Sequence, residues 1–222
     1  MIDTVIFDIG NVLVNFDWKT YVYGTFDEQT ANILADAIWT SGYWVEFDRG
    51  VLSDAEIVTL MEQAAPAYEK EIHMVLEHSG EFLEKYAYTN EWIERLKNAG
   101  YRVLYLSNYG ESLMERRPDV LDFLPMMDGG LFSCHAKFIK PDPEIYAMLC
   151  QNYALNPKEC LFLDDSEENI EAAKRFGLHA IRFLGYENSY DSVMKYLEAH
   201  RKQLQKLLEI KSKECDTCRN MK

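Results

Sequence analysis

Residues able to do chemistry follow short apolar segments of this sequence. They are Asp8, the pair Ser107 and Asn108, and the pair Asp164 and Asp165. Lys140 lies between the last two positions, before Pro141. If the apolar segments are parallel strands, their carboxyl ends meet at one edge of the sheet, where ligands of open α/β sheets bind. A carboxylate nucleophile, a hydroxyl beside an amide, an ammonium group and an acidic pair are together what metal-assisted phosphoryl transfer requires.

The acidic pair predicts a metal site. A phosphate dianion is repelled by Asp8 and two further carboxylates unless a divalent cation offsets their charge. Mg²⁺ is a hard cation that prefers carboxylate, carbonyl and water oxygens. We therefore expect Asp164 and Asp165 to form part of a magnesium site, with Mg²⁺ as the cofactor.

The remaining polar residues suit the phosphate group. Charge concentrates on the equatorial phosphate oxygens in the transition state, where hydrogen-bond donors lower its energy. The expected substrate-binding donors are Ser107 Oγ, the Asn108 amide and Lys140. Lys140 is also expected to act in catalysis by holding Asp8 ionised. Each residue alone would suit a turn or a helix cap, but their shared position at strand ends favours chemistry.

The spacing of apolar residues predicts an α/β fold. Apolar segments of strand length occur at 4–7, 103–106, 161–163 and 180–183. Their continuous apolar character suits strands buried on both faces. Amphipathic stretches separate the later segments: one begins after Asp142 and Pro143, and another ends at Gly177. Strands that alternate with helices favour a doubly wound parallel sheet.

Residues 18–89 break this alternation, because their pattern is helical throughout. The segments 25–28 and 53–56 match the capping-box pattern, and each opens a run with apolar spacing near 3.6 residues. A short helix over 82–86 is expected to end this insertion, and a last helix is expected over 189–210. The predicted division is a core of residues 1–17 and 90–210, a helical insertion at 18–89, and a flexible polar tail at 211–222.

Composition and charge exclude several classes of function. The 222 residues carry a net charge of −14, so the surface field repels nucleic acid, which is not an expected partner. No apolar run reaches the roughly 18 residues that cross a membrane, so no membrane partner is expected. Five cysteines, with Cys150 and Cys160 among apolar neighbours, favour reduced thiols and a cytoplasmic location. Cys215 and Cys218 form a lone CxxC pair, to which we assign no role.

Four segments around the site residues match the motifs of a known family. They are FDIGNVLV at 7–14, LSN at 106–108, KPDPEIY at 140–146 and FLDDSEEN at 162–169. In this order they resemble the haloacid dehalogenase superfamily of aspartate-nucleophile phosphatases, and the resemblance covers residues 2 to about 185. It implies a modified Rossmann core, dependence on Mg²⁺ and an aspartyl-phosphate intermediate on Asp8. The metal ligands that it implies are Asp8, the backbone carbonyl of Gly10, Asp164 and Asp165.

The same resemblance identifies the helical insertion as the small cap of subclass I members. In such proteins a cap loop reaches over the active site and contacts the leaving group. Arg49, with Glu46 and Tyr43, is expected to bind a sugar or another polar alcohol here. The alternative is that Arg49 and Asp48 form a surface ion pair and that Trp44 only packs.

The sequence departs from the family pattern at Gly10. Phosphatases and mutases of the family usually carry a second aspartate here, which protonates the leaving oxygen and later activates water. General acid–base catalysis contributes typically about 10²–10⁴-fold to a rate. The D-x-G-N form resembles the branch that contains bacterial α-D-glucose-1-phosphate phosphatases, whose anomeric leaving group needs less protonation. Asp17, Glu46 and Asp48 are candidate replacement acids.

The expected function is Mg²⁺-dependent hydrolysis of a small phosphomonoester, a sugar phosphate, through the intermediate on Asp8. The expected partner is therefore a small phosphorylated metabolite, and the oligomeric state stays open. The alternative is a phosphate-binding or partner-binding protein of the same fold with little turnover. A dehalogenase would have no use for the acidic pair, and a mutase would need the acid that Gly10 lacks. A response-regulator receiver would carry its acidic pair after the first strand.

Overall fold

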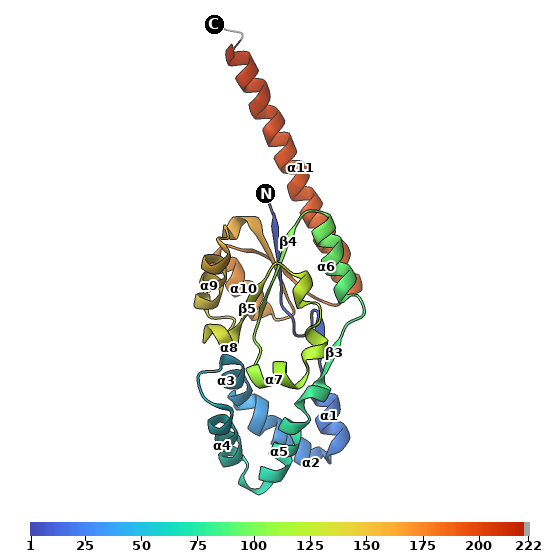
Figure 1. Ribbon diagram of the computed structural model, residues 1–222, viewed down its shortest axis with the longest axis vertical. Coiled ribbons are helices and arrows are strands. Elements are labelled where there is room, and N and C mark those ends of the chain that lie inside the picture. The colour runs from blue at the N-terminus through green and yellow to red at the C-terminus, as the bar shows by residue number, and fades with distance from the viewer. Residues whose placement is uncertain (220–222) are drawn as a thin grey trace.

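The structure is a computed structural model that describes the backbone of residues 1–219 and the side chains of residues 1–202 (Figure 1). Its strands are β1 Thr4–Phe7, β2 Val14–Phe16, β3 Leu83–Lys85, β4 Arg102–Ser107, β5 Gly130–Phe132, β6 Cys160–Asp164 and β7 His179–Arg182. Its α-helices are α1 Trp18–Thr25, α2 Glu28–Ala35, α3 Tyr43–Arg49, α4 Asp54–Ala64, α5 Glu69–Glu77, α6 Thr89–Asn98, α7 Glu111–Arg116, α8 Ser133–Ala136, α9 Pro143–Tyr153, α10 Glu167–Phe176 and α11 Tyr186–Arg219. The pair Cys215 and Cys218 lies outside the described side chains.

A five-stranded parallel sheet forms the core, in the order β5-β4-β1-β6-β7. All four residues of β1 are buried, because β4 and β6 flank it and helices cover both faces of the sheet. This arrangement explains why the segment is apolar without alternation. The predicted doubly wound α/β fold is confirmed.

The two faces of the sheet bury separate apolar clusters. Ile6 packs on one face with residues of α9 and α10, while Val5 and Phe7 pack on the other with residues of α6 and α11. Trp92 of α6 is fully buried there, with its ring 4.8 Å from the ring of Phe7. Figure 1 shows α9 and α10 on one side of the sheet and α6 with the start of α11 on the other.

The helices α1–α5 lie together at the end of the sheet where the parallel strands have their carboxyl ends (Figure 1). Helices α1, α2 and α4 begin at Asp17, Asp27 and Ser53, whose side chains accept hydrogen bonds from backbone N–H groups of the first turn. Ser53 and Glu56 form the predicted capping box. The one expected over 25–28 is wrong, because Thr25 ends α1 and Asp27 caps α2. The helical insertion therefore lies over the edge that carries the expected site residues.

Three elements differ from the sequence-based expectation. The short helix expected over 82–86 is wrong: β3 lies there and pairs antiparallel with β2, because Leu83 lies opposite Phe16 and both turn toward the apolar interior. β5 was not predicted, since it has three residues and begins at Gly130. A Cβ on Gly130 would lie 2.3 Å from Tyr105 Cγ, so glycine permits β5 to approach β4. The last helix continues past 210 to Arg219.

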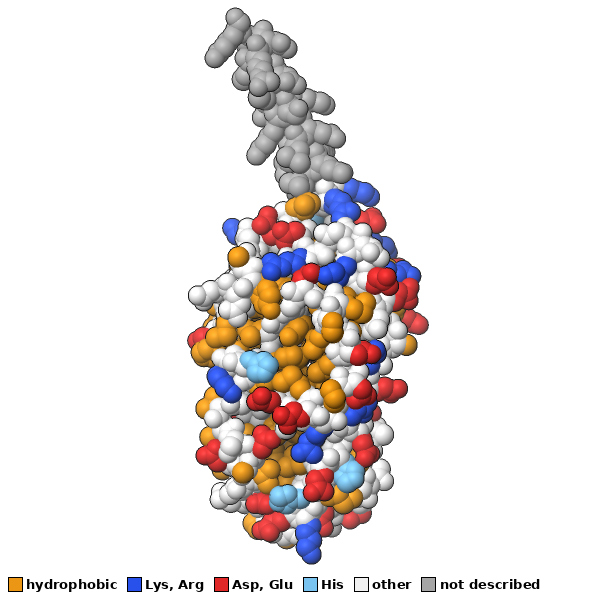
Figure 2. Space-filling view, viewed as in Figure 1, with side chains coloured by type: hydrophobic (Ala, Val, Ile, Leu, Met, Phe, Trp, Pro, Cys, Tyr) orange, Lys and Arg blue, Asp and Glu red, His pale blue; other side chains and the backbone are white. Residues whose placement is uncertain are grey.

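The surface is mixed on the face seen in Figure 2. Apolar side chains gather in the middle of this face, over β4 and β5, and basic and acidic side chains both lie around them. Among the described residues, no helix combines the length and the apolar character needed to cross a bilayer.

Candidate active site

The carboxyl ends of β1, β4 and β6 bring the expected site residues together. Asp8 follows β1, and its backbone N–H donates to the carbonyl of Leu163 in β6 at 2.8 Å. Ser107 is the last residue of β4, and Asp164 is the last residue of β6. Because β4 and β6 flank β1 in parallel, these side chains meet at one edge of the sheet.

Lys140 bridges two of the carboxylates from a loop. Its Nζ lies 2.8 Å from Asp8 Oδ1 and 2.7 Å from Asp164 Oδ2, and its side chain is only 1% exposed. Burial acts to lower the pKa of Lys140, but Asp164 and Asp8 together raise it above its ordinary value. The ammonium group therefore stays charged between its two partners.

Asn108 holds the backbone of Lys140 in place. Asn108 Nδ2 donates to the Lys140 carbonyl at 3.0 Å, and the Lys140 N–H donates to Asn108 Oδ1 at 2.8 Å. This reciprocal pair fixes the loop that carries the ammonium group. Asn108 thus positions Lys140, a role that the sequence did not indicate.

The Asp8 carboxyl is less acidic than the sequence predicted. Burial raises the pKa of Asp8 to about 7; Lys140 acts to lower it, and the charges of Asp164 and Asp165 raise it further. Lys140 thus acts in the expected direction, toward an ionised Asp8, but burial opposes it and the one ammonium is shared by two carboxylates. The edge of the sheet is left with an excess of negative charge.

Asp164 and Asp165 are adjacent in the sequence but differ in their surroundings. Asp164 is fully buried, and both of its oxygens accept protein hydrogen bonds, from Ser166 N, Asn169 Nδ2 and the ammonium group. Asp165 is partly buried, and its Oδ2 accepts from Asn11 Nδ2 at 3.2 Å. Burial, with the neighbouring Asp164, raises the pKa of Asp165. Among the described contacts, Asp165 keeps a carboxylate oxygen without a partner and Asp164 does not.

The carboxylates at this edge fit a hard cation. Carboxylate oxygens of Asp8, Asp164 and Asp165 lie within 4.8 Å of one another. Asp8 Oδ1 accepts from Lys140 and from the N–H of Ile9 at 2.7 Å, whereas Oδ2 has no hydrogen bond among the described residues. An oxygen-only donor set with excess negative charge suits Mg²⁺. The residues present therefore fit the expected metal.

Ser107 offers a free hydroxyl at the same edge. Its side chain is 1% exposed, and Oγ has no hydrogen-bond partner within the described part of the chain. A buried polar group without a partner lowers stability by about 1–3 kcal/mol unless a ligand satisfies it. Ser107 Oγ is thus suited to the phosphate oxygen that the sequence analysis assigned to it.

The cap helix α3 covers the site from the other side. It packs against α8 of the core, and a cavity of about 70 Å³ remains where cap and core meet. The cavity is lined by Gly10, Phe16, Trp44, Asp48, Asn108, Tyr109 and Leu113. Asp48 is the only carboxyl in this lining, and Trp44 both lines the cavity and packs on Trp39 with ring centroids 5.4 Å apart.

Arg49 points elsewhere in this arrangement. Its Nη1 donates to Asp142 at 3.0 Å, and its Nε donates to Glu46 at 3.1 Å. It therefore ties α3 to the loop before α9, and its contact with a substrate remains a prediction. The alternative surface pair of Arg49 with Asp48 is wrong, because adjacent residues of a helix do not face each other.

We expect Arg49→Met to lower the free energy of unfolding by no more than about 1 kcal/mol, because partly exposed ion pairs contribute little. The guanidinium is 24% exposed and Asp142 is 37% exposed. Urea unfolding of both proteins at the same ionic strength measures the difference. A loss several times larger would show that this tether stabilises the docked cap far more than its exposure indicates.

Three residues support the site without having been predicted to do so. Asn11, with a positive φ of 55°, holds Asp165, and Asn169 holds Asp164. An asparagine in a tight turn after the first strand was the available signal for Asn11. Ser133 donates from Oγ to the backbone carbonyl of Asp48 at 2.5 Å. Nothing in the sequence connects these two residues, which are 85 positions apart.

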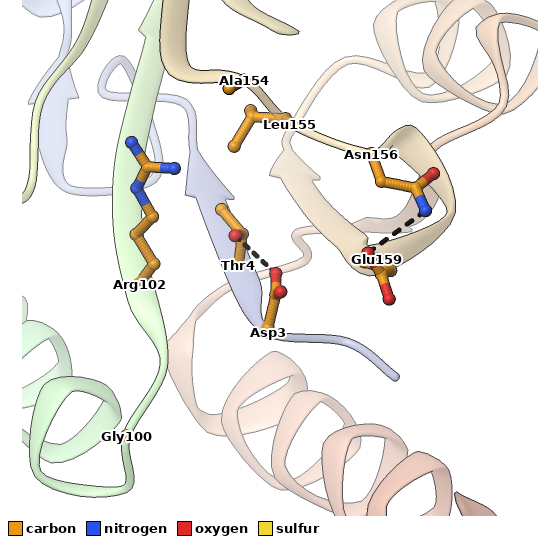
Figure 3. Close-up of a pocket in the computed structure, with 8 residues that line it drawn as sticks. All are labelled: Asp3, Thr4, Gly100, Arg102, Ala154, Leu155, Asn156 and Glu159. Carbon is orange, nitrogen blue, oxygen red and sulfur yellow. Dashed lines mark hydrogen bonds between the residues drawn. The ribbon is translucent and has the colours of Figure 1, made fainter.

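A second cavity, of about 300 Å³, lies at the opposite end of the sheet, where β1 and β4 begin (Figure 3). Its lining residues are Asp3, Thr4, Gly100, Arg102, Ala154, Leu155, Asn156 and Glu159. Arg102 donates to the Tyr153 carbonyl at 2.8 Å, and Thr4 donates to Asp3 at 2.7 Å. These groups are satisfied within the protein, and none of the site carboxylates lies here.

The fold and the site define the class of protein. The haloacid dehalogenase-like hydrolase family matches residues 2–177, and the chain belongs to this family. It is an enzyme family, and the chain is accordingly a hydrolase.

Individual relatives include dehalogenases and phosphatases. The chain is 31% identical over 100 residues to (S)-2-haloacid dehalogenase 4A of Burkholderia cepacia, covering 45% of this chain and 43% of that protein. It is 33% identical over 79 residues to a phosphorylated carbohydrates phosphatase of Thermotoga maritima, covering 36% of each. Its fold resembles a haloacid dehalogenase family enzyme of Bacteroides thetaiotaomicron in complex with magnesium and inorganic phosphate. That match has a TM-score of 0.65 and 22% identity, over 82% of this chain and 94% of that one.

Proposed function

We propose that the protein is a Mg²⁺-dependent phosphatase that hydrolyses a small phosphomonoester through an aspartyl-phosphate on Asp8. The observation that carries the proposal is the buried arrangement in which Lys140 bridges Asp8 and Asp164, with Asp165 beside them. A protein that only binds phosphate would not need a nucleophilic carboxylate beside the phosphate group.

The residues of the site divide the work of binding the metal and the phosphate. Asp8, the Gly10 carbonyl and Asp165 would hold Mg²⁺, which supplies positive charge to the phosphate oxygens when bound. Asp164 has its oxygens occupied by protein donors, so we propose that it positions Lys140. Ser107 and Lys140 would donate to the equatorial phosphate oxygens.

The reaction then has two steps on the protein. A carboxylate oxygen of Asp8 attacks phosphorus, the P–O bond to the alcohol breaks, and the leaving oxygen takes a proton from a general acid. A water molecule next attacks the aspartyl-phosphate and gives a proton to the conjugate base of that acid, which releases inorganic phosphate and the free Asp8 carboxylate. Lys140, 2.8 Å from Asp8, offsets the charge that develops in both steps.

The substrate class that we propose is a sugar phosphate, with the phosphate on an anomeric oxygen. The cavity beside the site is small and carries the aromatic rings of Phe16 and Trp44, which suit the apolar face of a sugar ring. The Thermotoga maritima relative, which is named for phosphorylated carbohydrates, supports this class. A cytoplasmic location belongs to the same proposal, and Cys134, Cys150 and Cys160, which are free thiols, support it.

We also propose that residues 18–89 move as a cap. The β2–β3 pair connects this segment to the core at both of its ends, and Asp17 and Phe82 are joined by a backbone hydrogen bond of 2.8 Å. Opening at this connection would admit the substrate, and closing would bring α3 back over Asp8.

The test is a panel of sugar phosphates with 4-nitrophenyl phosphate, assayed for inorganic phosphate. 2-Chloropropionate, assayed for chloride, is included because dehalogenases are among the relatives. Phosphate release from at least one ester, without chloride release, supports the proposal. Chloride release without phosphate release would replace it with dehalogenation. Binding of phosphate esters without release of phosphate or chloride would favour the phosphate-binding alternative.

We expect removal of the metal with EDTA to reduce phosphate release by at least about 10³-fold, because the excess negative charge of the site repels the substrate. Added Mg²⁺ should restore the full rate, and Ca²⁺ should not, since it favours longer and more numerous oxygen contacts. Steady-state rates against free Mg²⁺ concentration measure the dependence. Full activity in EDTA after exhaustive dialysis would contradict it.

A further inference from the structure

Gly10 leaves the site without the usual acid, and the structure separates the three candidate replacements. Asp17 caps α1 through Thr20 and is partly exposed, and Glu46 pairs with Arg49. Neither residue is in the lining of the cavity, whereas Asp48 is, together with Gly10 itself. Gly10, where the usual acid is absent, therefore lines the cavity from the core, and Asp48 lines the same cavity from α3.

The core holds the backbone of Asp48 in place. Ser133 Oγ donates to the Asp48 carbonyl at 2.5 Å and accepts from the Tyr109 N–H at 2.9 Å. The backbone N–H of Gly110 lies on the side of the Asp48 carboxyl and acts to lower its pKa. A Cβ on Gly110 would lie 2.7 Å from the ring of Phe47, so α3 approaches the core more closely there than any other residue would permit.

The surroundings of Asp48 favour its neutral form. Burial raises the pKa of Asp48 to about 8; the Gly110 N–H and Lys140 act to lower it, and Asp8 adds to the rise. A neutral carboxyl has one accepting oxygen and one O–H donor. A general acid works best when its pKa lies near the working pH.

We propose that Asp48, on the cap, is the general acid that replaces the residue missing at position 10. This inference rests on the proposed phosphatase function and goes beyond it. As the P–O bond breaks, the Asp48 O–H gives its proton to the leaving oxygen, and Asp48 becomes a carboxylate. In the second step this carboxylate takes a proton from the attacking water, so the neutral carboxyl is restored when phosphate leaves.

The test compares leaving groups in Asp48→Asn. Asparagine keeps the size of the side chain and an oxygen that can accept from Gly110, but it has no acidic proton to give. For an alkyl phosphate we expect kcat/KM to fall by about 10²–10³-fold, and for 4-nitrophenyl phosphate by no more than about threefold. The reason is that a nitrophenolate leaves without protonation.

Asp36→Asn is the matched control. Asp36 lies on the cap, is exposed, and makes no described side-chain hydrogen bond, so the same chemical change should leave both esters unaffected. An equal loss of activity for both esters in Asp48→Asn would overturn the inference, because it would assign Asp48 a structural role in docking. Unchanged activity on both esters would overturn it too.

A second variant tests the same idea from the core. A Cβ on Gly10 would meet nothing within 4 Å, so the first atom of the Gly10→Asp side chain has room. When Gly10→Asp is added to Asp48→Asn, kcat/KM on the alkyl ester should rise at least about tenfold above that of Asp48→Asn alone. This is a small part of the ~10²–10⁴-fold that a general acid contributes. No restoration, with metal-dependent turnover of 4-nitrophenyl phosphate intact, would count against an acid at this place. If wild type releases no phosphate from any ester, the proposed function fails first.

Discussion

Asp8→Asn is expected to reduce phosphate release by at least about 10⁴-fold, because removing a catalytic nucleophile usually costs a large part of the rate enhancement. Asparagine has nearly the same shape, and its oxygen can accept from Lys140 and from the Ile9 N–H, as Asp8 Oδ1 does. The amide cannot form the aspartyl-phosphate. Release of inorganic phosphate, with saturating Mg²⁺ and the best ester of the panel, measures the effect.

The control for this variant is Asp17→Asn. Asp17 caps α1 with its carboxylate, and asparagine is an equally good cap residue. Activity should stay within about twofold of wild type, since Asp17 only serves this cap. Wild type should also bind beryllofluoride, a phosphoryl mimic, in the presence of Mg²⁺, and Asp8→Asn should not. Substantial turnover in Asp8→Asn would remove Asp8 from the mechanism.

Lys140→Met is expected to lower the free energy of unfolding by about 3–5 kcal/mol, the usual effect of removing one partner from a buried ion pair. The loss should be large because Lys140 serves two carboxylates at once, and the Asp164 side chain is fully buried. The variant should also lose turnover, since no ammonium group then lies beside Asp8 to offset the charge that develops there. Urea unfolding at pH 7 measures the stability.

Lys97→Met gives the contrast. Lys97 pairs with Asp128 at a site where both side chains are about one-third exposed, so its loss should be within about 1 kcal/mol. Adding Asp164→Asn to Lys140→Met should recover part of the lost stability, because one uncompensated charge is removed. A loss in Lys140→Met no larger than that in Lys97→Met would mean that the carboxylates tolerate burial without the ammonium.

The residues of the core site could be predicted because they follow directly from local sequence. Each lies at the end of an apolar run, and parallel strands place those ends side by side. Asp8, Ser107 and Asp164 needed nothing more than this rule. The alternation of strands with helices and the helical stretch after the first strand followed in the same way, since both depend on patterns that repeat within a few residues.

The parts that were missed depend on contacts between distant segments. β2 and β3 have three residues each and are separated by the whole insertion, so neither has a periodic signal of its own. Arg49 pairs with Asp142, 93 positions away, instead of with its neighbour. Asp164 and Asp165 differ in burial and in their hydrogen-bond donors, which include Asn169 for Asp164 and Asn11 for Asp165. The sequence shows both asparagines only as members of motifs, without these contacts.

The position of Asp48 on the cap makes reactivity conditional on assembly. If the general acid and the nucleophile both lay on the core, the site would be complete whether the cap were open or closed. Here Asp48 lines the cavity only while α3 lies against the core, where Ser133 donates to the Asp48 carbonyl. Esters with poor leaving groups would therefore react only in the closed molecule, from which bulk water is excluded. Esters with activated leaving groups would escape this requirement, so the ratio of the two rates would report how often the cap is closed.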